Sequence, residues 1–251
     1  MKPFSIALVL MTLLGFAGTA LAGEKKLTAD DVMKIVDETL TITKDQRYTA
    51  EVRVVRDGKV VKSMKFEAIL KGLVTKRITF TAPGDVKGMA VLTTADGLMY
   101  IYMPSYKRVR RVASHVRNQG FMGTDFSPEE LAAASMSATW NAQLVGENDK
   151  SWILELTPKA GNDTIYSKLK VTVSKANRGV ERIESYDSTG KIARTQERSK
   201  WQRFGPINIP TLMAVTDHQT GSRSELHFSD CEVNVGLSDA EFSTRALMRA
   251  E

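Results

Sequence analysis

A run of basic residues is the densest charge in the sequence, and it comprises Lys107, Arg108, Arg110, Arg111 and Arg117. On a strand, Lys107 and Arg111 share one face with Val109, while Arg108 and Arg110 share the other. Unpaired charges on both faces are too costly to bury, so this strand is expected at an edge with at least one face in water. The run predicts a docking patch for acidic protein or lipid phosphate. The alternative is a charged edge that only prevents sheets from associating.

The segment from Gly120 to Phe126 carries apolar side chains between glycines. Met and Phe suit an irregular, exchangeable apolar ligand, so Phe121, Met122 and Phe126 are candidates for the entrance of a lipid-binding cavity. The alternative is a loop tucked permanently into the core. Upstream, the segment 98–103 is apolar on both faces, so one face can line a cavity while the other packs. The remaining cavity candidates are Tyr100, Tyr102, Met103 and Trp140.

Catalytic and metal-binding patterns are missing from the sequence. The three histidines, His115, His218 and His227, have no partner at metal-ligand spacing, and no nucleophile elbow or phosphate-binding glycine loop is present. Cys231 is the single cysteine, which excludes an internal disulfide. We therefore expect a protein that is not an enzyme and that uses no cofactor or metal. The net charge, 35 − 29 = +6, suits anionic surfaces and is too small to indicate nucleic acid.

Period-two alternation broken by turn dipeptides runs through most of the chain. It predicts strands at 48–56, 59–70, 76–81, 89–94, 98–103, 107–114, 141–146, 151–157, 165–174, 179–187, 191–201, 211–218 and 222–235. Thr28, Ser127 and Ser238 each precede an acidic residue by three positions, which predicts the starts of three short helices. Roughly a dozen strands at this spacing indicate a mainly β (α+β) chain, built as one large antiparallel sheet or barrel.

The first 22 residues have the pattern of a secretory signal. Lys2 precedes an apolar run, and Ala20-Leu21-Ala22 is a small-residue cleavage site, so we expect cleavage after Ala22 and a mature form with 34 − 29 = +5 charges. An uncleaved membrane anchor is the alternative, but the apolar run is short for a span. Gly23 stands where a lipoprotein needs cysteine, so no lipid anchor is expected. The prediction is a periplasmic, monomeric protein with one domain over 23–251.

Several motifs resemble those of the outer-membrane lipoprotein-sorting protein family, which is LolA-like. They are Ala82-Pro83-Gly84-Asp85-Val86-Lys87-Gly88, Tyr102-Met103-Pro104 leading into the basic run, Phe121-Met122-Gly123-Thr124-Asp125-Phe126-Ser127, Tyr186-Asp187, Ile209-Pro210-Thr211, His218-Gln219-Thr220-Gly221 and Phe228-Ser229-Asp230. The chain is most similar to the branch associated with RND/MMPL-type exporters. The resemblance implies an unclosed antiparallel β-barrel covered by a few short helices, with an apolar cavity that shelters acyl chains.

Two functions from different classes follow. The first is a periplasmic carrier or chaperone for the acyl chains of a lipid or lipoprotein, which contacts membrane surfaces transiently and works with an inner-membrane RND/MMPL-type exporter. An acyl chain of ~16 carbons in water costs on the order of 12 kcal/mol, so an enclosed cavity is needed. The second is an interaction module that docks on the exporter through the basic strand and holds no ligand. A lipid hydrolase is disfavoured because no nucleophile–base pair is evident.

Overall fold

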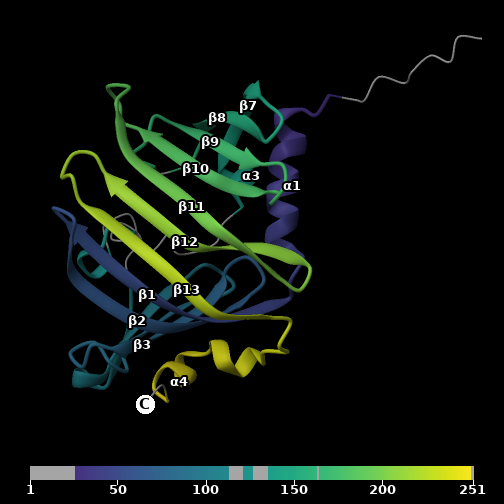
Figure 1. Cartoon of the computed structure of the whole chain (residues 1–251). Coiled ribbons are helices and arrows are strands. Elements are labelled where there is room, and N and C mark those ends of the chain that lie inside the picture. Colours follow the sequence, from purple (N-terminus) through teal and green to yellow (C-terminus); the bar gives the residue numbers. More distant parts are fainter. Residues whose placement is uncertain (1–25, 113–120, 127–134, 163, 250–251) are drawn as a thin grey trace, which may run out of the picture.

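A computed structural model describes residues 26–112, 121–126, 135–162 and 164–249, and its strands form one sheet (Figure 1). The sheet has 13 strands in the order β6-β5-β4-β3-β2-β1-β13-β12-β11-β10-β9-β8-β7, and all its pairs are antiparallel. The strands are β1 (Asp45–Arg56), β2 (Lys59–Lys71), β3 (Thr75–Ala82), β4 (Ala90–Thr93), β5 (Met99–Met103), β6 (Arg108–Arg111), β7 (Trp140–Glu147), β8 (Ser151–Pro158), β9 (Lys168–Ser174), β10 (Gly179–Tyr186), β11 (Ile192–Phe204), β12 (Ile207–Asp217) and β13 (Arg223–Val233). Because β6 and β7 end the order without pairing in the described part of the chain, the sheet is not closed, which confirms the predicted fold class.

The topology consists of two meanders joined by one long-range pairing. Strands β1–β6 and β7–β13 each follow one another through successive neighbours, and β1 pairs with β13 along most of its length. The turn at Asp57-Gly58 has positive φ at both residues, 50° and 72°, as the hairpin signal predicts. The chain between β6 and β7 therefore links the two ends of the open sheet, and it includes the segment predicted to form the cavity entrance.

The hairpin of β11 and β12 is longer than the sequence predicts. The sequence predicts that one strand ends at Trp201 and that the next begins at Thr211. The structure continues the ladder to the tip, with Trp201 opposite Pro210. Strand β12 pairs with β13 only over Leu212–Thr216, so Pro210 lies where one side of its strand has no partner. A missing N–H costs little at such a position.

Short helices flank the sheet, and two of the three predicted starts are confirmed. They are α1 (Ala29–Thr41), α3 (Met136–Thr139) and α4 (Thr244–Leu247), with 3-10 turns η1 (Pro104–Tyr106), η3 (Phe121–Gly123) and η4 (Asp239–Phe242). Thr28 and Asp31 form a complete capping box, as do Ser238 and Glu241, so both caps satisfy amides that a helix start leaves free. The start predicted at Ser127 and the signal segment 1–22 lie outside the described residues.

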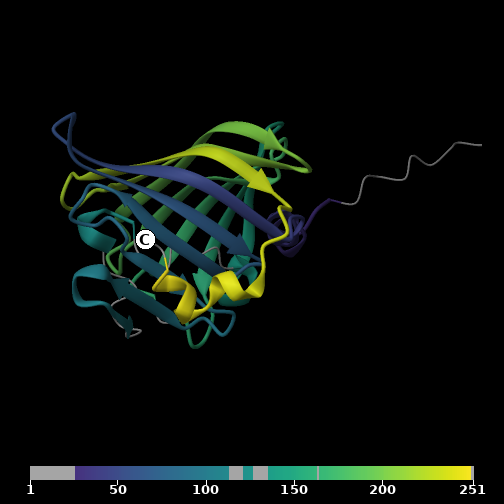
Figure 2. The same cartoon turned by 90° about the horizontal axis from the view of Figure 1, so that it is seen from below.

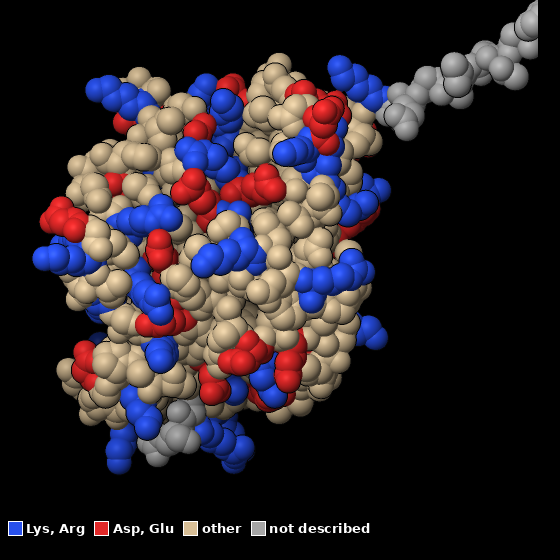
Figure 3. Space-filling view, viewed as in Figure 1, with Lys and Arg blue, Asp and Glu red and all other residues tan. Residues whose placement is uncertain are grey.

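The C-terminal segment covers the outer face of the sheet, which is the face opposite the one that carries Val52 and Leu226. Leu237, Phe242 and Leu247 of this segment are buried against Ile69 and Leu92 of the sheet. Figure 2 shows this yellow segment running along the curved sheet. Figure 3 shows acidic and basic side chains interspersed over the face viewed there, in keeping with the modest net charge.

Asp45 fixes the start of the C-terminal segment, which leads to a first prediction. Its buried carboxylate accepts hydrogen bonds from the N–H groups of Val235 (2.6 Å), Gly236 (3.1 Å) and Leu237 (3.0 Å). Asp45→Ala leaves these amides without an acceptor, so we expect a loss of about 2–3 kcal/mol in the free energy of unfolding. Urea denaturation measures the loss. Asp149→Ala, in the exposed β7–β8 turn, is the control and should change stability by less than about 0.5 kcal/mol.

Candidate functional site

The inner face of the sheet, defined by Val52 and Leu226, carries a large apolar cluster on strands β1–β5, β12 and β13. Phe126, which belongs to none of these strands, is one of its most deeply buried members, with 1% of its surface exposed. The fully buried members are Ala50, Val52, Met64, Phe66, Ala68, Ile78, Phe80, Val86, Val91, Met99, Phe126, Val215 and Leu226. An apolar surface of this extent is the feature that a protein sheltering acyl chains requires.

A second apolar cluster lies on the same face over β7–β10. Val32 and Val36 of α1 pack there against Leu154, Leu156 and Val171. The pairing of β11 places Arg194, Gln196 and Arg198 on the inner face between the two clusters, opposite Asp217, Val215 and Met213 respectively. The polar side chains of β11 thus divide the inner face into two apolar areas. Helix α1 covers one of them.

The segment 121–126, which we call the cover segment, lies over the first apolar area. Met122 packs against the cluster that contains Phe126. Met122 and Gly123 both have positive φ, 53° and 74°, which turns the chain sharply before Thr124. Phe126 and Met122 were predicted as residues of a cavity entrance, and both lie on the apolar inner face. The side chain of Phe121 lies outside the described part of the structure.

Asp125 holds the cover segment to the strands beneath it. Its carboxylate accepts hydrogen bonds from the Ser222 hydroxyl and from the Ser224 hydroxyl, the latter at 2.7 Å. Its own N–H donates to Ser224 Oγ at 2.9 Å, and its carbonyl accepts from the Arg194 guanidinium. On the other side, Lys62 Nζ donates to the carbonyl of Met122 at 2.6 Å. The cover segment is therefore held by side-chain hydrogen bonds and by the packing of Phe126, and not by strand pairing.

Two of the predicted cavity residues lie on the opposite face. Tyr102 and Tyr100 pack with the C-terminal segment around Leu237 and Leu247. Alternation along β5 instead directs Met99 and Ile101 into the inner cluster. The sequence showed that both faces of this strand are apolar, but only the C-terminal segment decides which one is the outer face. Tyr100 and Tyr102 are therefore excluded from the acyl-binding surface proposed below.

The other predicted cavity residues fall in different places. Met103 has the same alternation as Ile101, so it lies on the inner side of β5 and is partly buried. Trp140 packs instead with the second apolar cluster, near α1. The candidates proposed from sequence therefore do not form one site. Met122 and Phe126 share the inner cluster, while Met103 lies on the same face next to the edge strand, opposite Arg108.

The basic strand is an edge strand, as the charges on both its faces predict. Arg108 and Arg110 of β6 lie opposite Met103 and Ile101 and so flank the inner face, while Arg111 lies opposite Tyr100 on the outer side. All three are exposed, as is Lys107 in the preceding turn. Arg117 lies outside the described residues. Two exposed guanidinium groups therefore stand at the rim of the first apolar area.

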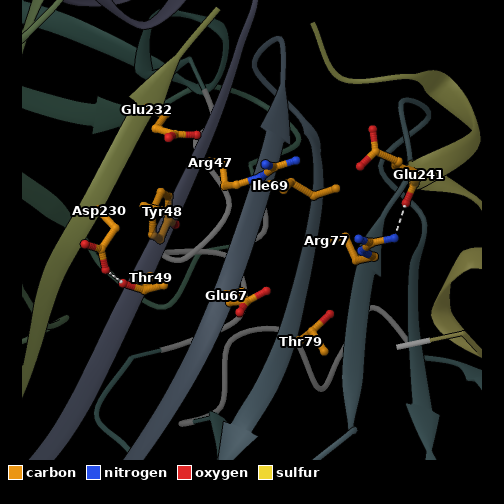
Figure 4. Close-up of a pocket in the computed structure, with 10 residues that line it drawn as sticks. All are labelled: Arg47, Tyr48, Thr49, Glu67, Ile69, Arg77, Thr79, Asp230, Glu232 and Glu241. Carbon is orange, nitrogen blue, oxygen red and sulfur yellow. Dashed lines mark hydrogen bonds between the residues drawn. The ribbon is translucent and has the colours of Figure 1, made fainter. Parts of the chain in front are cut away.

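Two pockets among the described residues lie away from the centre of the apolar inner face. One, of about 410 Å³, lies on the outer face between the sheet and η4, with Arg47 and Arg77 among Glu67, Glu232 and Glu241 (Figure 4). Burial lowers the pKa of Arg77, which donates to the carbonyl of Glu241 at 2.9 Å. The other lies beside α1, between Asp37 and Lys159. On the inner face, where the sequence predicts a cavity, Phe126 belongs to the apolar cluster and Met122 packs against it.

Cys231, the single cysteine, is partly buried on β13. Burial raises the pKa of the Cys231 thiol to about 11, which makes it a poor nucleophile at neutral pH. No group of His, Cys, Asp and Glu side chains in the described ranges is arranged to hold a metal ion. Within those ranges, every helix is too short or too polar to cross a membrane.

Sequence reasoning missed three inner-face residues that matter to this site. Ser222 and Ser224 were assigned to a strand without a role, and only the folded structure brings them to Asp125. Lys76 is buried on β3 with 6% of its surface exposed. The available signal in the sequence was the alternation along this strand, which places Lys76 on the same face as Ile78 and Phe80.

The chain matches a family model over residues 72–249, which is most of its length, and the description of that family reads "-like: Uncharacterized protein". The chain belongs to this family. No curated protein is similar enough in sequence to match.

Three solved structures share this family member's fold over nearly their whole length. A DUF1329 family protein from Desulfovibrio piger is 26% identical, with a TM-score of 0.79 over 87% of this chain and 98% of that one. A putative outer membrane lipoprotein-sorting protein domain from Vibrio parahaemolyticus is 24% identical, with a TM-score of 0.77 over 88% and 100%. A LolA superfamily protein from Nitrosomonas europaea is 19% identical, with a TM-score of 0.72 over 88% and 100%. The predicted LolA-like fold is confirmed.

Proposed function

We propose that the protein is a periplasmic carrier that shelters the acyl chains of a lipid or lipoprotein on the inner face of its sheet. The observation that carries the proposal is the way in which the cover segment lies on the inner face. It places Phe126 and Met122 on the apolar area that an acyl chain would occupy, yet it is held there by side-chain hydrogen bonds. The LolA-like fold supports the same role, since one solved structure of this fold is described as a putative lipoprotein-sorting domain.

In this proposal the described structure is the closed state, in which Phe126 and Met122 cover the inner face. Displacing Phe126 and Met122 exposes the apolar side chains of β1–β5, and an acyl chain entering the same space restores their burial. The exchange replaces the contacts of Phe126 and Met122 with those of the acyl chain, and it breaks the polar contacts of Asp125 and Lys62. A carrier needs such a balance because it must both take up and release its cargo.

Native mass spectrometry of protein extracted gently from the periplasm tests the proposal. We expect co-purifying species with the mass of a lipid or of an acylated peptide, and their removal by delipidation. Protein that carries no such species, and that binds no acyl probe after delipidation, would contradict the carrier function.

The second candidate is an interaction module that docks on an exporter and holds no ligand. The filled inner face favours it, because a permanent core would also bury Phe126. It predicts that acyl probes never bind and that the cover segment never opens. The variants argued in the Discussion separate the two functions.

The basic edge strand gives a prediction for either function. Arg108→Glu with Arg110→Glu should weaken binding to vesicles that contain anionic phospholipid by about tenfold to hundredfold at low salt, since each cation near such a surface contributes about 1 kcal/mol. Sedimentation with vesicles measures the loss, and raising the salt should reduce wild-type binding in the same way.

The matched control is Lys200→Glu with Arg203→Glu, which makes the same change in net charge at exposed positions of β11. It should retain most of the binding. Equal losses in the two double variants would show that net charge, and not the edge strand, drives binding. In that case the strand only guards the edge of the sheet.

A further inference from the structure

Lys76 is a buried cation on the apolar inner face. Across the sheet it lies between Leu70 of β2 and Thr93 of β4, and Met99 of β5 follows Thr93 in the same row. Leu70 and Met99 both belong to the inner cluster. Along β3, the next residues on this face are Ile78 and Phe80, which are buried in that cluster. Lys76 thus marks one end of the apolar area that the cover segment occupies.

Lys76 has no polar partner in the described structure, and its ammonium group is not among the fully enclosed polar atoms there, so it keeps slight contact with solvent. No hydrogen bond or ion pair there involves it, although only 6% of the residue is exposed. The hydroxyl of Thr93, in the same row, is also buried. Burial lowers the pKa of Lys76 to about 7, and no charged side chain contributes to that shift. A lysine is costly in such a place unless a counter-ion joins it.

We propose that Lys76 binds the carboxylate of a long-chain ligand whose tail lies along the inner face of β3. This inference rests on the proposed carrier function and names its ligand class as an acidic amphiphile, such as a fatty acid. The tail would pass Ile78 and Phe80 and take the space of Phe126 and Met122. A single ammonium point charge on an apolar wall matches a single compact anion at the end of an apolar chain.

Delipidated protein titrated with dodecanoate and with dodecan-1-ol by calorimetry tests the inference. The two probes have the same tail and differ in the head group. We expect the wild type to bind dodecanoate about tenfold or more tightly than the alcohol at pH 6.5, because the pair forms a charge-assisted hydrogen bond. Lys76→Met nearly keeps the length of the side chain and removes the charge. It should therefore abolish the preference for dodecanoate while retaining the binding of dodecan-1-ol.

Lys65→Met is the matched control, since Lys65 is an exposed residue on the outer side of β2. It should leave the preference for dodecanoate intact. Lys76→Met removes an uncompensated buried charge, so it is expected to fold at least as stably as the wild type. Thermal melting of each variant confirms that lost binding is not lost folding.

The outcomes separate the inference from the function on which it rests. Equal binding of both probes by wild type and by Lys76→Met would overturn the role of Lys76 and leave the carrier function standing. Failure of both probes to bind any variant would overturn the carrier function itself. If Lys76→Met still prefers dodecanoate, another cation of the protein binds the carboxylate, and the inference is also overturned.

The pH dependence gives an independent readout. Only protonated Lys76 pairs with a carboxylate, so dodecanoate affinity should be constant from about pH 6 to 7 and then weaken by up to about tenfold per pH unit. The groups beside Lys76 in its row, Leu70 and Thr93, do not titrate in this range. Binding of the alcohol should not weaken in the same way, and Lys76→Met should lose the dependence. A wild-type affinity that is flat to pH 9 would contradict the assignment.

Discussion

Phe126→Ala should lower the free energy of unfolding by about 3–5 kcal/mol, the usual cost of truncating a buried phenylalanine. Only 1% of Phe126 is exposed, and it packs among Phe66, Phe80 and Met64 on the inner face. For a domain of this size the loss corresponds to a fall of roughly 10 °C in melting temperature. In a carrier, the space left by the ring lies where the acyl chain binds. Saturating dodecan-1-ol should therefore restore most of the lost stability.

Leu154→Ala is the matched control for this experiment. Leu154 is also fully buried, but it lies in the second apolar area beneath α1. Its truncation should cost about 2–5 kcal/mol, with no recovery when the alcohol is added. If dodecan-1-ol restores the stability of Phe126→Ala but not that of Leu154→Ala, the ligand lies under the cover segment. Recovery of neither variant would favour the interaction module, in which Phe126 is a permanent core residue.

Much of the fold can be read from the sequence because local signals decide it. Alternation places Val52, Phe66 and Leu226 on one face, Asp57-Gly58 sets a hairpin, and capping residues such as Thr28 fix helix starts. Charges on both faces of 107–111 correctly predict an edge strand. Each of these inferences depends on residues within a few positions of one another, and packing elsewhere in the chain does not reverse them.

The site depends on contacts between distant parts of the chain, so the sequence predicts it less well. Tyr102 and Ile101 are both large side chains that can pack in a core. Which of the two faces inward is decided by Leu237 and Leu247, more than a hundred residues away. Asp125 meets Ser222 and Ser224 only because β13 pairs with β1 at the centre of the sheet. Alternation in the sequence assigns side chains to the two faces of a strand. It does not show which face another part of the chain covers, or which part covers it.

Asp125→Ala should strengthen the binding of acyl probes while it weakens the fold. The substitution removes the acceptor of the Ser222 and Ser224 hydroxyls and leaves the backbone contact between Asp125 N and Ser224 Oγ in place. A hydrogen bond to a charged group contributes about 1.5–3 kcal/mol, so the free energy of unfolding should fall by about that amount or somewhat more. The same loss favours the open state. If the closed state dominates in the wild type, apparent affinity should rise about tenfold to hundredfold, because it scales with the open fraction.

Asp187→Ala provides the comparison that makes this result specific. Asp187 is an equally well-bonded carboxylate, which accepts from Thr189 Oγ1 at 2.7 Å and from the N–H of Lys191 at 3.0 Å, but it lies in the β10–β11 turn. It should lose a similar stability without any gain in affinity. Stopped-flow fluorescence with a dansylated fatty acid measures both the rate and the strength of binding. Asp125→Ala that loses stability and gains no binding would mean that the inner face never opens, because a loosened cover over a usable acyl site must raise the population that can accept a chain.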